Sequence, residues 1–337
     1  MAFIISLLLI LSLNVEAGSI KVLMLKDPNL PLPSEGARSL GTVNGKIIVN
    51  GEVYSGNLEV IGDSNGLYVI KELPLEDYVE GVVSAEGGKD WELEALKAQA
   101  VIARTYAILY IENNPKKGFH LTSTIMNQAY KEGDNSPLIK RAVKETEGEV
   151  LVYNDRPINA LYHSVCVGKT EIPEEVWGND YPTVTSPPGT VTSPPGTVTS
   201  PPYLKSVDCN TKDTPYDNWQ RRFSIPNLER AIGIDGIKDI EVVDYTLTGR
   251  VRTLRFKTEG SLIEIKATEL RRMLGYKELP STDFSVRIEG DSVIFDGRGW
   301  GHGVGLSQWG AQEMAKNGKD YREILEHFYP GAVIKKQ

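Results

Sequence analysis

The residue with the clearest chemical potential is a glutamate that closes one apolar face of a short helix. Counting from Leu75, apolar side chains recur at i, i+3, i+4, i+7 and i+8, and Glu86 takes position i+11 on that face. Gly87 and Gly88 then end the helix, so the carboxyl lies at the negative end of its dipole. Poor hydration and the dipole both raise a carboxyl pKa towards the range of a general acid. The alternative is an ordinary C-terminal glutamate whose side chain bends to water.

An arginine on the next helix is the second candidate. Asp90 suits the N-cap of a helix from Trp91 to about Glu112, which is apolar on most sides. Arg104 lies about 40° from Ala100 around the axis, close to the apolar stripe. A buried guanidinium needs a partner, because an unpaired buried charge is very costly. Two interpretations stay open: Arg104 pairs with a structural carboxylate, or it lines a cleft beside Glu86.

A glycine-rich segment near the C-terminus would let the backbone approach a ligand closely. Residues 297–310 hold six glycines around Trp300, His302 and Trp309. The lysine and the spacing of a phosphate-binding loop are missing, whereas tryptophan faces stack on sugar rings. Tight packing of this loop before a helix at Ser307 explains the same glycines. We expect His302 to be a hydrogen-bonding support rather than a second acid or base.

These residues must be positioned by strands as well as helices. Apolar or alternating runs in the first part predict strands at 20–25, 46–49, 58–61 and 67–70, separated by turns at 44–45, 50–51, 55–57 and 65–66. After the helical segment, strand patterns occur at 149–153, 160–165, 240–247, 251–257, 285–289 and 292–295, and helices close the chain at 307–316 and 321–328. This order predicts an α+β fold: a β-rich N-terminal part over residues 18–70, a helical segment, and a mixed β-sheet second part around one cleft.

The first 17 residues predict an exported protein. An apolar run from Phe3 to Leu13 is too short to span a bilayer, and Val15 and Ala17 are small, as at a signal-peptide cleavage site. We therefore expect a signal peptide at 1–17, an extracytoplasmic location, and membrane contact only through an uncleaved leader. The net charge of −8, without a long basic block, argues against nucleic acid and favours a neutral saccharide over anionic polymers.

One segment is a proline-rich repeat. Thr-Val-Thr-Ser-Pro-Pro-Gly occurs at 183–189 and 190–196, and its first six residues recur at 197–202. Such a composition cannot build a core and predicts an extended surface loop. Removing the loop joins Pro182 to Tyr203 smoothly, which indicates an insertion into one continuous domain. The alternative is a spacer between two mobile domains.

Six segments, taken in order, resemble the SpoIID/LytB family, the stage II sporulation protein D and amidase-enhancer group. The segments are LPLEDYVEGVVSAE (73–86), LEALKAQAVIARTY (93–106), ALYHS (160–164), EVW (175–177), YLKSV (203–207) and GRGWGHGVGLSQWGA (297–311). The resemblance implies a catalytic domain over residues 71–337, interrupted by the repeat loop at 183–202. It also implies a lytic transglycosylase that acts on peptidoglycan, with a preference for strands without stem peptides.

The resemblance assigns roles residue by residue. Glu86 matches the catalytic glutamate of the family, and Arg104 matches its important arginine, which favours the cleft interpretation. Further substrate-binding positions are expected at His163, Ser164, Tyr203, Lys205, His302 and Gln308. The carboxyl of Glu86 would protonate the oxygen between N-acetylmuramic acid and N-acetylglucosamine, and its carboxylate would then help the muramyl 6-hydroxyl close a 1,6-anhydro ring. A second carboxylate would instead allow simple hydrolysis.

A binding protein is the rival interpretation of the same segments. Such a protein would use the cleft without bond cleavage, and would recruit or stimulate an N-acetylmuramoyl-L-alanine amidase. The expected partners are peptidoglycan glycan strands and, under either interpretation, other cell-wall hydrolases.

The two cysteines leave a further alternative open. In an exported protein, a disulfide between Cys166 and Cys209 is expected. The alternative is zinc bound by His163, Cys166 and Cys209, because some relatives use metal nearby, but the sequence offers no clear fourth ligand. No other cofactor is expected. The chain departs from the family pattern in two places: Val167-Gly168 follows Cys166 where the family has Gly-Gly, and the repeat lies before Tyr203. Both departures concern substrate loops.

Overall fold

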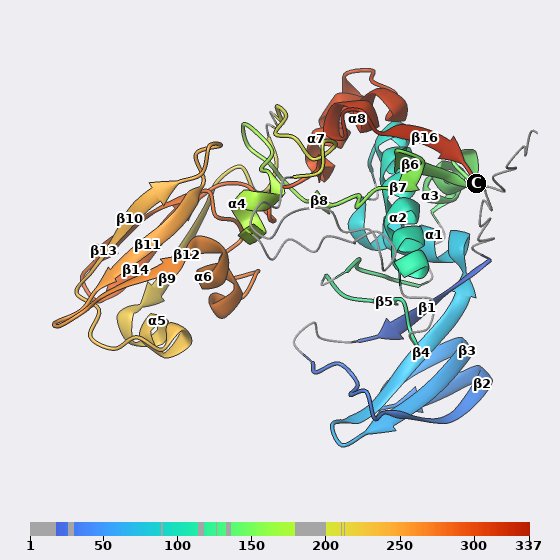
Figure 1. The fold of residues 1–337 in the computed structure, drawn as a ribbon, viewed down its shortest axis with the longest axis horizontal. Helices are drawn as coiled ribbons and strands as arrows, with labels where there is room; N and C mark the ends of the chain where they lie inside the picture. Colours follow the sequence, from blue (N-terminus) through green and yellow to red (C-terminus); the bar gives the residue numbers. More distant parts are fainter. Residues whose placement is uncertain are drawn as a thin grey trace, which may run out of the picture.

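The computed structural model describes residues 18–25, 30–88, 90–113, 118–125, 127–132, 136–178, 200–209, 211 and 213–337. The predicted leader at 1–17 and most of the repeat, up to residue 199, lie outside these residues. Within the described part, eight α-helices and sixteen strands form several small sheets, which confirms the α+β prediction (Figure 1). None of the described helices is both long enough and apolar enough to cross a membrane.

A five-stranded sheet forms the N-terminal part. Its order is β2-β3-β4-β1-β5, with β1 (Ser19–Met24), β2 (Arg38–Val49), β3 (Glu52–Asp63), β4 (Gly66–Pro74) and β5 (Leu121–Thr122). Asn50 and Gly51, both with positive φ, make the predicted tight turn between β2 and β3. β4 runs directly into the helix that ends at Glu86, so the sheet fixes where that helix begins.

Two of the predicted turns are wrong. β2 continues through Asn44 and Gly45, and β3 continues through Gly56 and Asn57. The reason lies in the register, because Gly45 pairs with Gly56 and Asn44 with Asn57. The turn-forming residues of one strand pair with those of the other strand, so no backbone hydrogen-bonding partner is lost. The two strands therefore continue through these positions as one long hairpin.

The first hydrophobic core surrounds α1 (Leu75–Glu86), α2 (Leu93–Asn113) and α3 (Pro137–Glu145). The predicted apolar face of α1 is confirmed, since Tyr78, Val79, Val82 and Val83 are completely buried. α2 is the central helix, with 15 of its 21 residues buried. It packs against α1, α3 and the C-terminal helices, as its apolar residues on most sides predict.

A second core joins the middle of the chain to its C-terminus. It is covered by the sheet β16-β6-β7 and by two helices, with β6 (Glu149–Tyr153), β7 (Arg156–Pro157), α7 (Gln308–Lys316), α8 (Tyr321–Phe328) and β16 (Val333–Lys336). The strand predicted at 160–165 is shorter than expected. Only β8 (Tyr162–His163) forms, in parallel with β15 (Leu306–Ser307), at the start of α7.

The third core belongs to a separate lobe, drawn yellow to orange in Figure 1. Two three-stranded sheets and two helices build it: β9 (Trp219–Ser224), α5 (Ile225–Ile232), β10 (Asp239–Tyr245), β11 (Val251–Lys257), β12 (Leu262–Lys266), α6 (Ala267–Leu274), β13 (Phe284–Glu289) and β14 (Ser292–Gly297). The short helix α4 (Pro173–Trp177) lies against it, because Glu175 makes a bidentate ion pair with Arg252 of β11, at 2.7 and 2.8 Å. The glycine-rich segment after β14 leads back to α7.

Candidate active site

Glu86 is the last residue of α1, and its carboxylate accepts hydrogen bonds from three separate elements. Oε1 accepts from the backbone N–H of Ala129 at 2.9 Å and from the hydroxyl of Tyr162 on β8 at 3.1 Å. Oε2 accepts from Nε2 of Gln308, the first residue of α7, at 3.3 Å. Glu86 is half-buried: its carboxyl is enclosed by these three groups, and part of the residue remains exposed to solvent.

The environment acts on the Glu86 pKa in two opposite directions. Burial raises the pKa because it removes hydration from the charged form, while the hydrogen bonds from Ala129, Gln308 and Tyr162 lower it. Burial prevails, and the pKa lies above the ordinary value for glutamate. This is the direction that the helix pattern predicts. A group of this kind can hold a proton closer to neutral pH than a solvated glutamate can.

A second layer of polar side chains supports these contacts. Gln308 Nε2 also donates to Oε1 of Gln99 on α2 at 3.4 Å, and Gln99 is buried. Tyr78 donates to Oε1 of Gln128 at 3.2 Å and stacks on Tyr130, so it braces the loop that carries Ala129. Burial, followed by the nearby charge of Glu86, raises the pKa values of Tyr78 and Tyr162. Both phenols therefore stay protonated.

Sequence reasoning missed three of these contributors. Tyr162 lies inside the predicted motif next to His163, and strand alternation could have assigned the two side chains to opposite faces. Gln99 lies in the second quoted segment, as a polar residue on an otherwise apolar helix. The Ala129 amide has no sequence signal, since any residue except proline carries that donor.

Arg104 does not lie beside Glu86. Its guanidinium makes a bidentate ion pair with Glu76, at 2.6 and 2.7 Å, and donates to the Glu149 carbonyl at 3.0 Å. Glu76 is ten residues before Glu86 on the same helix, which corresponds to about 15 Å along the axis. The structural-carboxylate interpretation is therefore the one seen, and the cleft interpretation from the resemblance does not describe this arrangement.

His163 and His302 come together beside the glycine-rich segment. Their rings lie 5.7 Å apart, and the Trp177 ring lies 5.2 Å from His302. Both histidines bond to Val304: the His163 Nδ1 to its carbonyl at 3.1 Å, and the His302 Nδ1 from its N–H at 3.0 Å. Burial, with nearby arginines, lowers the pKa of His163 well below its usual range and that of His302 to about 3. Neutral rings fit the expected supporting role.

The remaining sequence candidates occupy other places. Ser164 accepts a backbone hydrogen bond from Trp309 at 3.1 Å through its carbonyl. Tyr203 accepts one from the Asn159 N–H at 3.2 Å and belongs to the second core. Lys205 is exposed. Of the predicted substrate-binding residues, only Gln308 makes a direct hydrogen bond to Glu86 among the residues that the structure describes.

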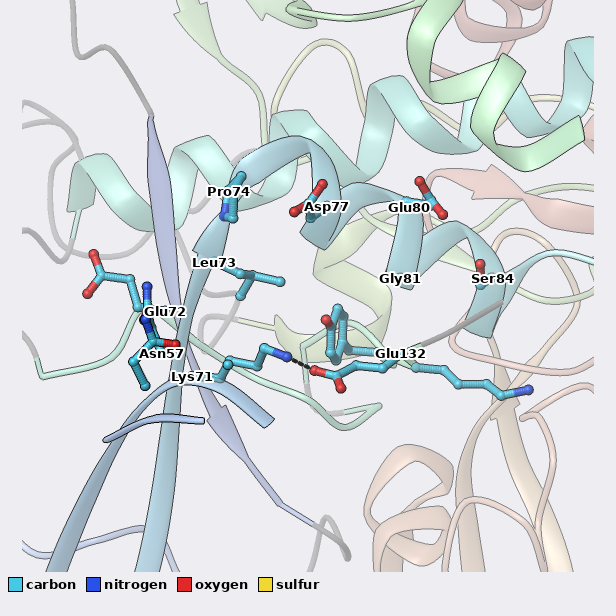
Figure 2. A pocket seen from close by; sticks show the side chains of 14 residues that line it. Asn57, Lys71, Glu72, Leu73, Pro74, Asp77, Glu80, Gly81, Ser84 and Glu132 are labelled. Carbon is cyan, nitrogen blue, oxygen red and sulfur yellow. Dashed lines mark hydrogen bonds and ion pairs between the residues drawn. The ribbon is translucent and has the colours of Figure 1, made fainter. Parts of the chain in front are cut away.

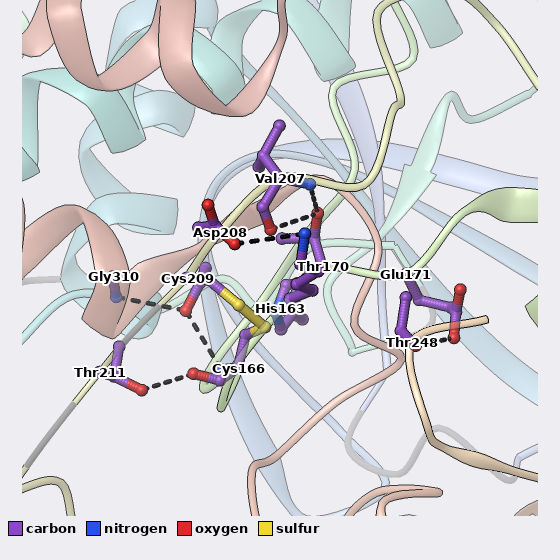
Figure 3. Close-up of a disulfide and its surroundings, with 12 residues drawn as sticks. His163, Cys166, Thr170, Glu171, Val207, Asp208, Cys209, Thr211, Thr248 and Gly310 are labelled. Carbon is purple, nitrogen blue, oxygen red and sulfur yellow. Dashed lines mark hydrogen bonds and ion pairs between the residues drawn. A yellow bond between two sulfur atoms is a disulfide. The ribbon is translucent and has the colours of Figure 1, made fainter. Parts of the chain in front are cut away.

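Cys166 and Cys209 form the expected disulfide, with their Cα atoms 5.8 Å apart (Figure 3). The alternative of zinc bound by His163, Cys166 and Cys209 does not fit this arrangement, because oxidised sulfurs cannot supply thiolate ligands. In the described ranges, no group of three or more His, Cys, Asp and Glu side chains could hold a metal ion.

A polar groove of about 520 Å³ runs along the outer face of α1 towards the Glu86 end (Figure 2). Asp77, Glu80 and Ser84 line it from the helix. An ion pair between Lys71 of β4 and Glu132 closes the opposite side. Glu86 is not among the residues that line this groove, because Asp77, Glu80 and Ser84 lie on the side of α1 away from the apolar face that carries Glu86. A groove with this lining suits a hydroxyl-rich ligand better than an apolar one.

Two family profiles match the chain. The family described as Stage II sporulation protein (SpoIID) matches residues 63–153, which include Glu86. A domain of unknown function, DUF8618, matches residues 204–305, which include all elements of the separate lobe from β9 to β14 and the first part of the glycine-rich segment.

Curated relatives extend the likeness over most of the chain. Stage II sporulation protein D of Bacillus amyloliquefaciens is 32% identical over 287 residues, with 79% of this chain and 75% of the relative covered. An uncharacterized protein of Brachyspira hyodysenteriae is 32% identical over 292 residues, with 85% and 73% covered. The amidase enhancer of Bacillus subtilis is 29% identical over 288 residues, with 76% of this chain and 40% of that relative covered. By these relatives and by the segments around Glu86, the chain belongs to the SpoIID family of stage II sporulation proteins.

Proposed function

We propose that the protein is a lytic transglycosylase that cleaves the linkage between N-acetylmuramic acid and N-acetylglucosamine in peptide-free peptidoglycan strands. The protonated Glu86 donates its proton to the bridging oxygen as the bond from that oxygen to C1 of the muramyl residue breaks. The resulting carboxylate then takes the proton of the muramyl 6-hydroxyl, while O6 bonds to C1 and closes the 1,6-anhydro ring. No water is consumed, and Glu86 ends the cycle protonated.

The observation that carries this proposal is the set of groups around one carboxyl. Among the described residues, the groups bonded to Glu86 are a backbone amide, a phenol and a carboxamide. These donors stabilise the ionised form of Glu86, while burial favours its protonated form. This suits a mechanism in which the same carboxyl acts first as acid and then as base.

Location and partners belong to the same proposal. Such an enzyme meets its substrate outside the cytoplasm, in agreement with the predicted signal peptide at 1–17, and works beside other cell-wall hydrolases. The polar groove along α1 supports binding of a glycan strand, because its lining offers carboxylates, amides and hydroxyls to sugar hydroxyls.

A second candidate function rests on the amidase enhancer among the relatives. In that case the protein binds the wall and stimulates an N-acetylmuramoyl-L-alanine amidase without breaking a glycosidic bond, and the proton held by Glu86 has no role.

Digestion of purified peptide-free glycan tests the proposal. The wild-type protein should release fragments with 1,6-anhydro-muramyl ends, seen by mass spectrometry, and Glu86→Gln should release none. Glu92→Gln, which changes an exposed glutamate between α1 and α2, is the matched control and should cleave normally. Hydrated reducing ends would replace the transglycosylase by a hydrolase. An absence of cleavage, with equal amidase stimulation by wild type and Glu86→Gln, would favour the second candidate.

A further inference from the structure

The separate lobe carries a hollow that the proposed function does not use. It has a volume of about 510 Å³ and lies where the three strands of the β13-β14-β9 sheet reach the same end (Figure 1). At that end Phe284 pairs with Gly297, and Gly297 pairs with Trp219. The lining of the hollow shares no described residue with the groove along α1 or with the hydrogen bonds of Glu86.

Six polar side chains from the ends of these strands line the hollow. They are Asn218, Gln220, Asp283, Ser285, Asp296 and Arg298. Gln220, Asp296 and Ser285 lie opposite one another in register, so strand alternation puts their side chains on one face of the sheet. The N–H of Arg298 donates to the Asp283 carbonyl at 2.9 Å, which keeps β13 and β14 paired one step further. The strand register thus gathers carboxylates, carboxamides, a hydroxyl and a guanidinium in one place.

Each carboxylate of the hollow is already balanced by an arginine. Asp283 Oδ2 accepts from Arg298 Nε at 2.9 Å, and Asp296 makes an ion pair with Arg287. Asp296 Oδ1 also accepts from Gln220 Nε2 at 2.6 Å. A bare metal ion or a phosphate is bound by uncompensated charge of the opposite sign. The balanced lining therefore fits a neutral ligand better than an ion.

The lining also keeps hydrogen-bonding groups for a ligand. The Asp283 side chain is 14% exposed and that of Arg298 is 51% exposed, so a partly buried carboxylate orients an exposed guanidinium. Arg298 uses Nε for this bond, and its two Nη groups make no hydrogen bond within the described residues. In the same part of the chain, the exposed side chains of Asn218 and Ser285 have no hydrogen-bonding partner. Such a mixture of donors and acceptors matches sugar hydroxyls, which both donate and accept.

Aromatic rings add apolar contact beside these polar groups. Trp219 and Phe284 line the hollow, and a Cβ on Gly297 would lie 2.2 Å from the Trp219 ring, so only glycine lets the indole lie on this strand. The chain continues from the same end of the sheet to Tyr216 and Trp300, whose half-buried rings lie 4.6 Å apart. A partly exposed ring can pack on the C–H groups of a sugar. Trp300 is a tryptophan of the glycine-rich segment that makes no contact with Glu86.

We propose that this hollow is a binding site for a neutral saccharide, separate from the candidate active site. The polar side chains bind the sugar hydroxyls, and the aromatic rings contact the sugar ring. The identity of the saccharide rests on the proposed function: if that function holds, it is part of the same glycan strand that Glu86 cleaves. The hollow then holds the strand and takes no part in the chemistry.

The backbone connects this lobe to the segment that carries Tyr162. Trp300 and Val165 donate to each other's carbonyls, both at 2.9 Å, and Val165 lies three residues after Tyr162. A strand that is long enough to occupy both sites stays bound at one when it leaves the other, as for any pair of linked sites. The lobe should therefore affect the binding of long strands more than the rate of bond cleavage.

Photo-cross-linking tests the saccharide site without catalysis. The probe is a neutral tetramer of N-acetylglucosamine that carries a diazirine, and the labelled peptides of the full-length protein are identified by mass spectrometry. Label should appear in residues 214–222 and 296–300, and excess unlabelled tetramer should prevent it. The double variant Asn218→Ala with Arg298→Ala removes two hydrogen-bonding side chains, so about tenfold more probe should be needed for equal labelling there.

The matched control changes an exposed asparagine and an exposed arginine of α5 in the same lobe, neither of which lines the hollow. Asn227→Ala with Arg230→Ala should keep wild-type labelling. Label only elsewhere, label that excess tetramer does not prevent, or equal labelling of the Asn218→Ala, Arg298→Ala variant would overturn the site. The first two outcomes need only the unsubstituted protein, so the test stands even where a variant fails to fold.

Kinetics on long peptide-free strands test the link to the proposed function. In protein with Glu86 intact, Asn218→Ala with Arg298→Ala should raise KM about tenfold and leave kcat unchanged, and the α5 control should change neither. A fall in kcat with an unchanged KM would contradict a strand-holding role. If the wild-type protein cleaves no strand, the proposed function fails, whereas the labelling of the lobe still decides whether it binds a saccharide.

Discussion

At the scale of single residues, the pKa of the half-buried Glu86 carboxyl decides what the site can do, and two opposite influences set that pKa. Burial favours the neutral form of Glu86, and three donors favour the ionised form. A general acid that later acts as a base needs both influences, because it must hold a proton before cleavage and be stable without it afterwards. Of the three donors, the Tyr162 hydroxyl can be removed with the smallest structural change, because Tyr162→Phe deletes one oxygen atom.

Tyr162→Phe should raise the pKa of Glu86 further and slow catalysis. The phenol stabilises the carboxylate, so its loss favours the protonated form and moves the high-pH limit of activity upward. A hydrogen bond to a charged group contributes about 1.5–3 kcal/mol, so kcat should fall roughly ten- to a hundredfold. The pH dependence of kcat measures both effects. Tyr153→Phe, in the second core, should leave the profile unchanged; a Tyr162→Phe profile shifted downward would contradict this account.

Sequence and structure agree on the place of Glu86 more than on its surroundings. The i+11 position of Glu86 and the direction of its pKa follow from helix periodicity, a local property. The ion pair of Arg104 could not be predicted in this way. The place of Arg104 on α2 predicts that it is buried, but its partner, Glu76, lies 28 residues earlier on another helix. Spacing alone could not choose between that partner and a cleft.

At the scale of elements, α1 is held to α2 by an ion pair in its first turn and carries the candidate site at its last residue. Glu76, in the first turn, accepts the bidentate pair from Arg104 of α2, and Glu86 closes the helix. The position of the Glu86 carboxyl thus depends on how α1 packs on α2. The ion pair between Arg104 and Glu76 stabilises that packing at the end of α1 that is far from Glu86.

Glu76→Gln should destabilise the fold. Arg104 is 1% exposed, so the change leaves a buried guanidinium without a counter-charge, at a cost of about 3 kcal/mol. Glu80→Gln changes a neighbouring glutamate of α1 with no ion pair in the described part of the chain, and should cost under about 0.5 kcal/mol. Urea unfolding gives both free energies. Equal losses for the two variants would contradict a structural role for the Arg104 pair.

The elements with a clear apolar pattern were the predictable ones. α1, α2, α7, α8, β6 and β11 lie close to their expected limits because each has a clear apolar pattern. The helices α3, α5 and α6 were not predicted, although they are as long as α7 and α8. Each of the three buries only two or three residues, whereas α7 and α8 bury four each, so their buried faces give a weaker pattern. The hairpin of β2 and β3 was broken into pieces because glycine signals a turn locally, whereas pairing between strands decides the outcome.

At the scale of the whole molecule, segments that are distant in sequence must be held together. Glu86, Tyr162 and Gln308 come from three parts of a chain of 337 residues. The second core joins the last two of these parts, and the disulfide from Cys166 to Cys209 lies within it. The disulfide bridges 43 residues of sequence, which include the proline-rich repeat.

Removing the disulfide should destabilise the protein substantially. Chain entropy for a bridge across 43 residues predicts a contribution of about 4 kcal/mol. The double variant Cys166→Ser with Cys209→Ser should therefore unfold at lower urea, and reduction of the wild-type protein should have the same effect. Treatment with a chelator should leave the melting temperature of the oxidised protein unchanged. Unfolding that responds to the chelator and not to the reductant would restore the zinc interpretation.

The most direct test of the central claim is the titration of Glu86 itself. Nuclear magnetic resonance of protein labelled at the glutamate carboxyl carbons, with the signal assigned by its loss in Glu86→Gln, gives the midpoint. We expect a midpoint above the ordinary value for glutamate, about 4.3, because burial outweighs the three hydrogen bonds. A midpoint at or below that value would mean a well-solvated or strongly stabilised carboxylate, and would remove the proton donor from the proposed reaction.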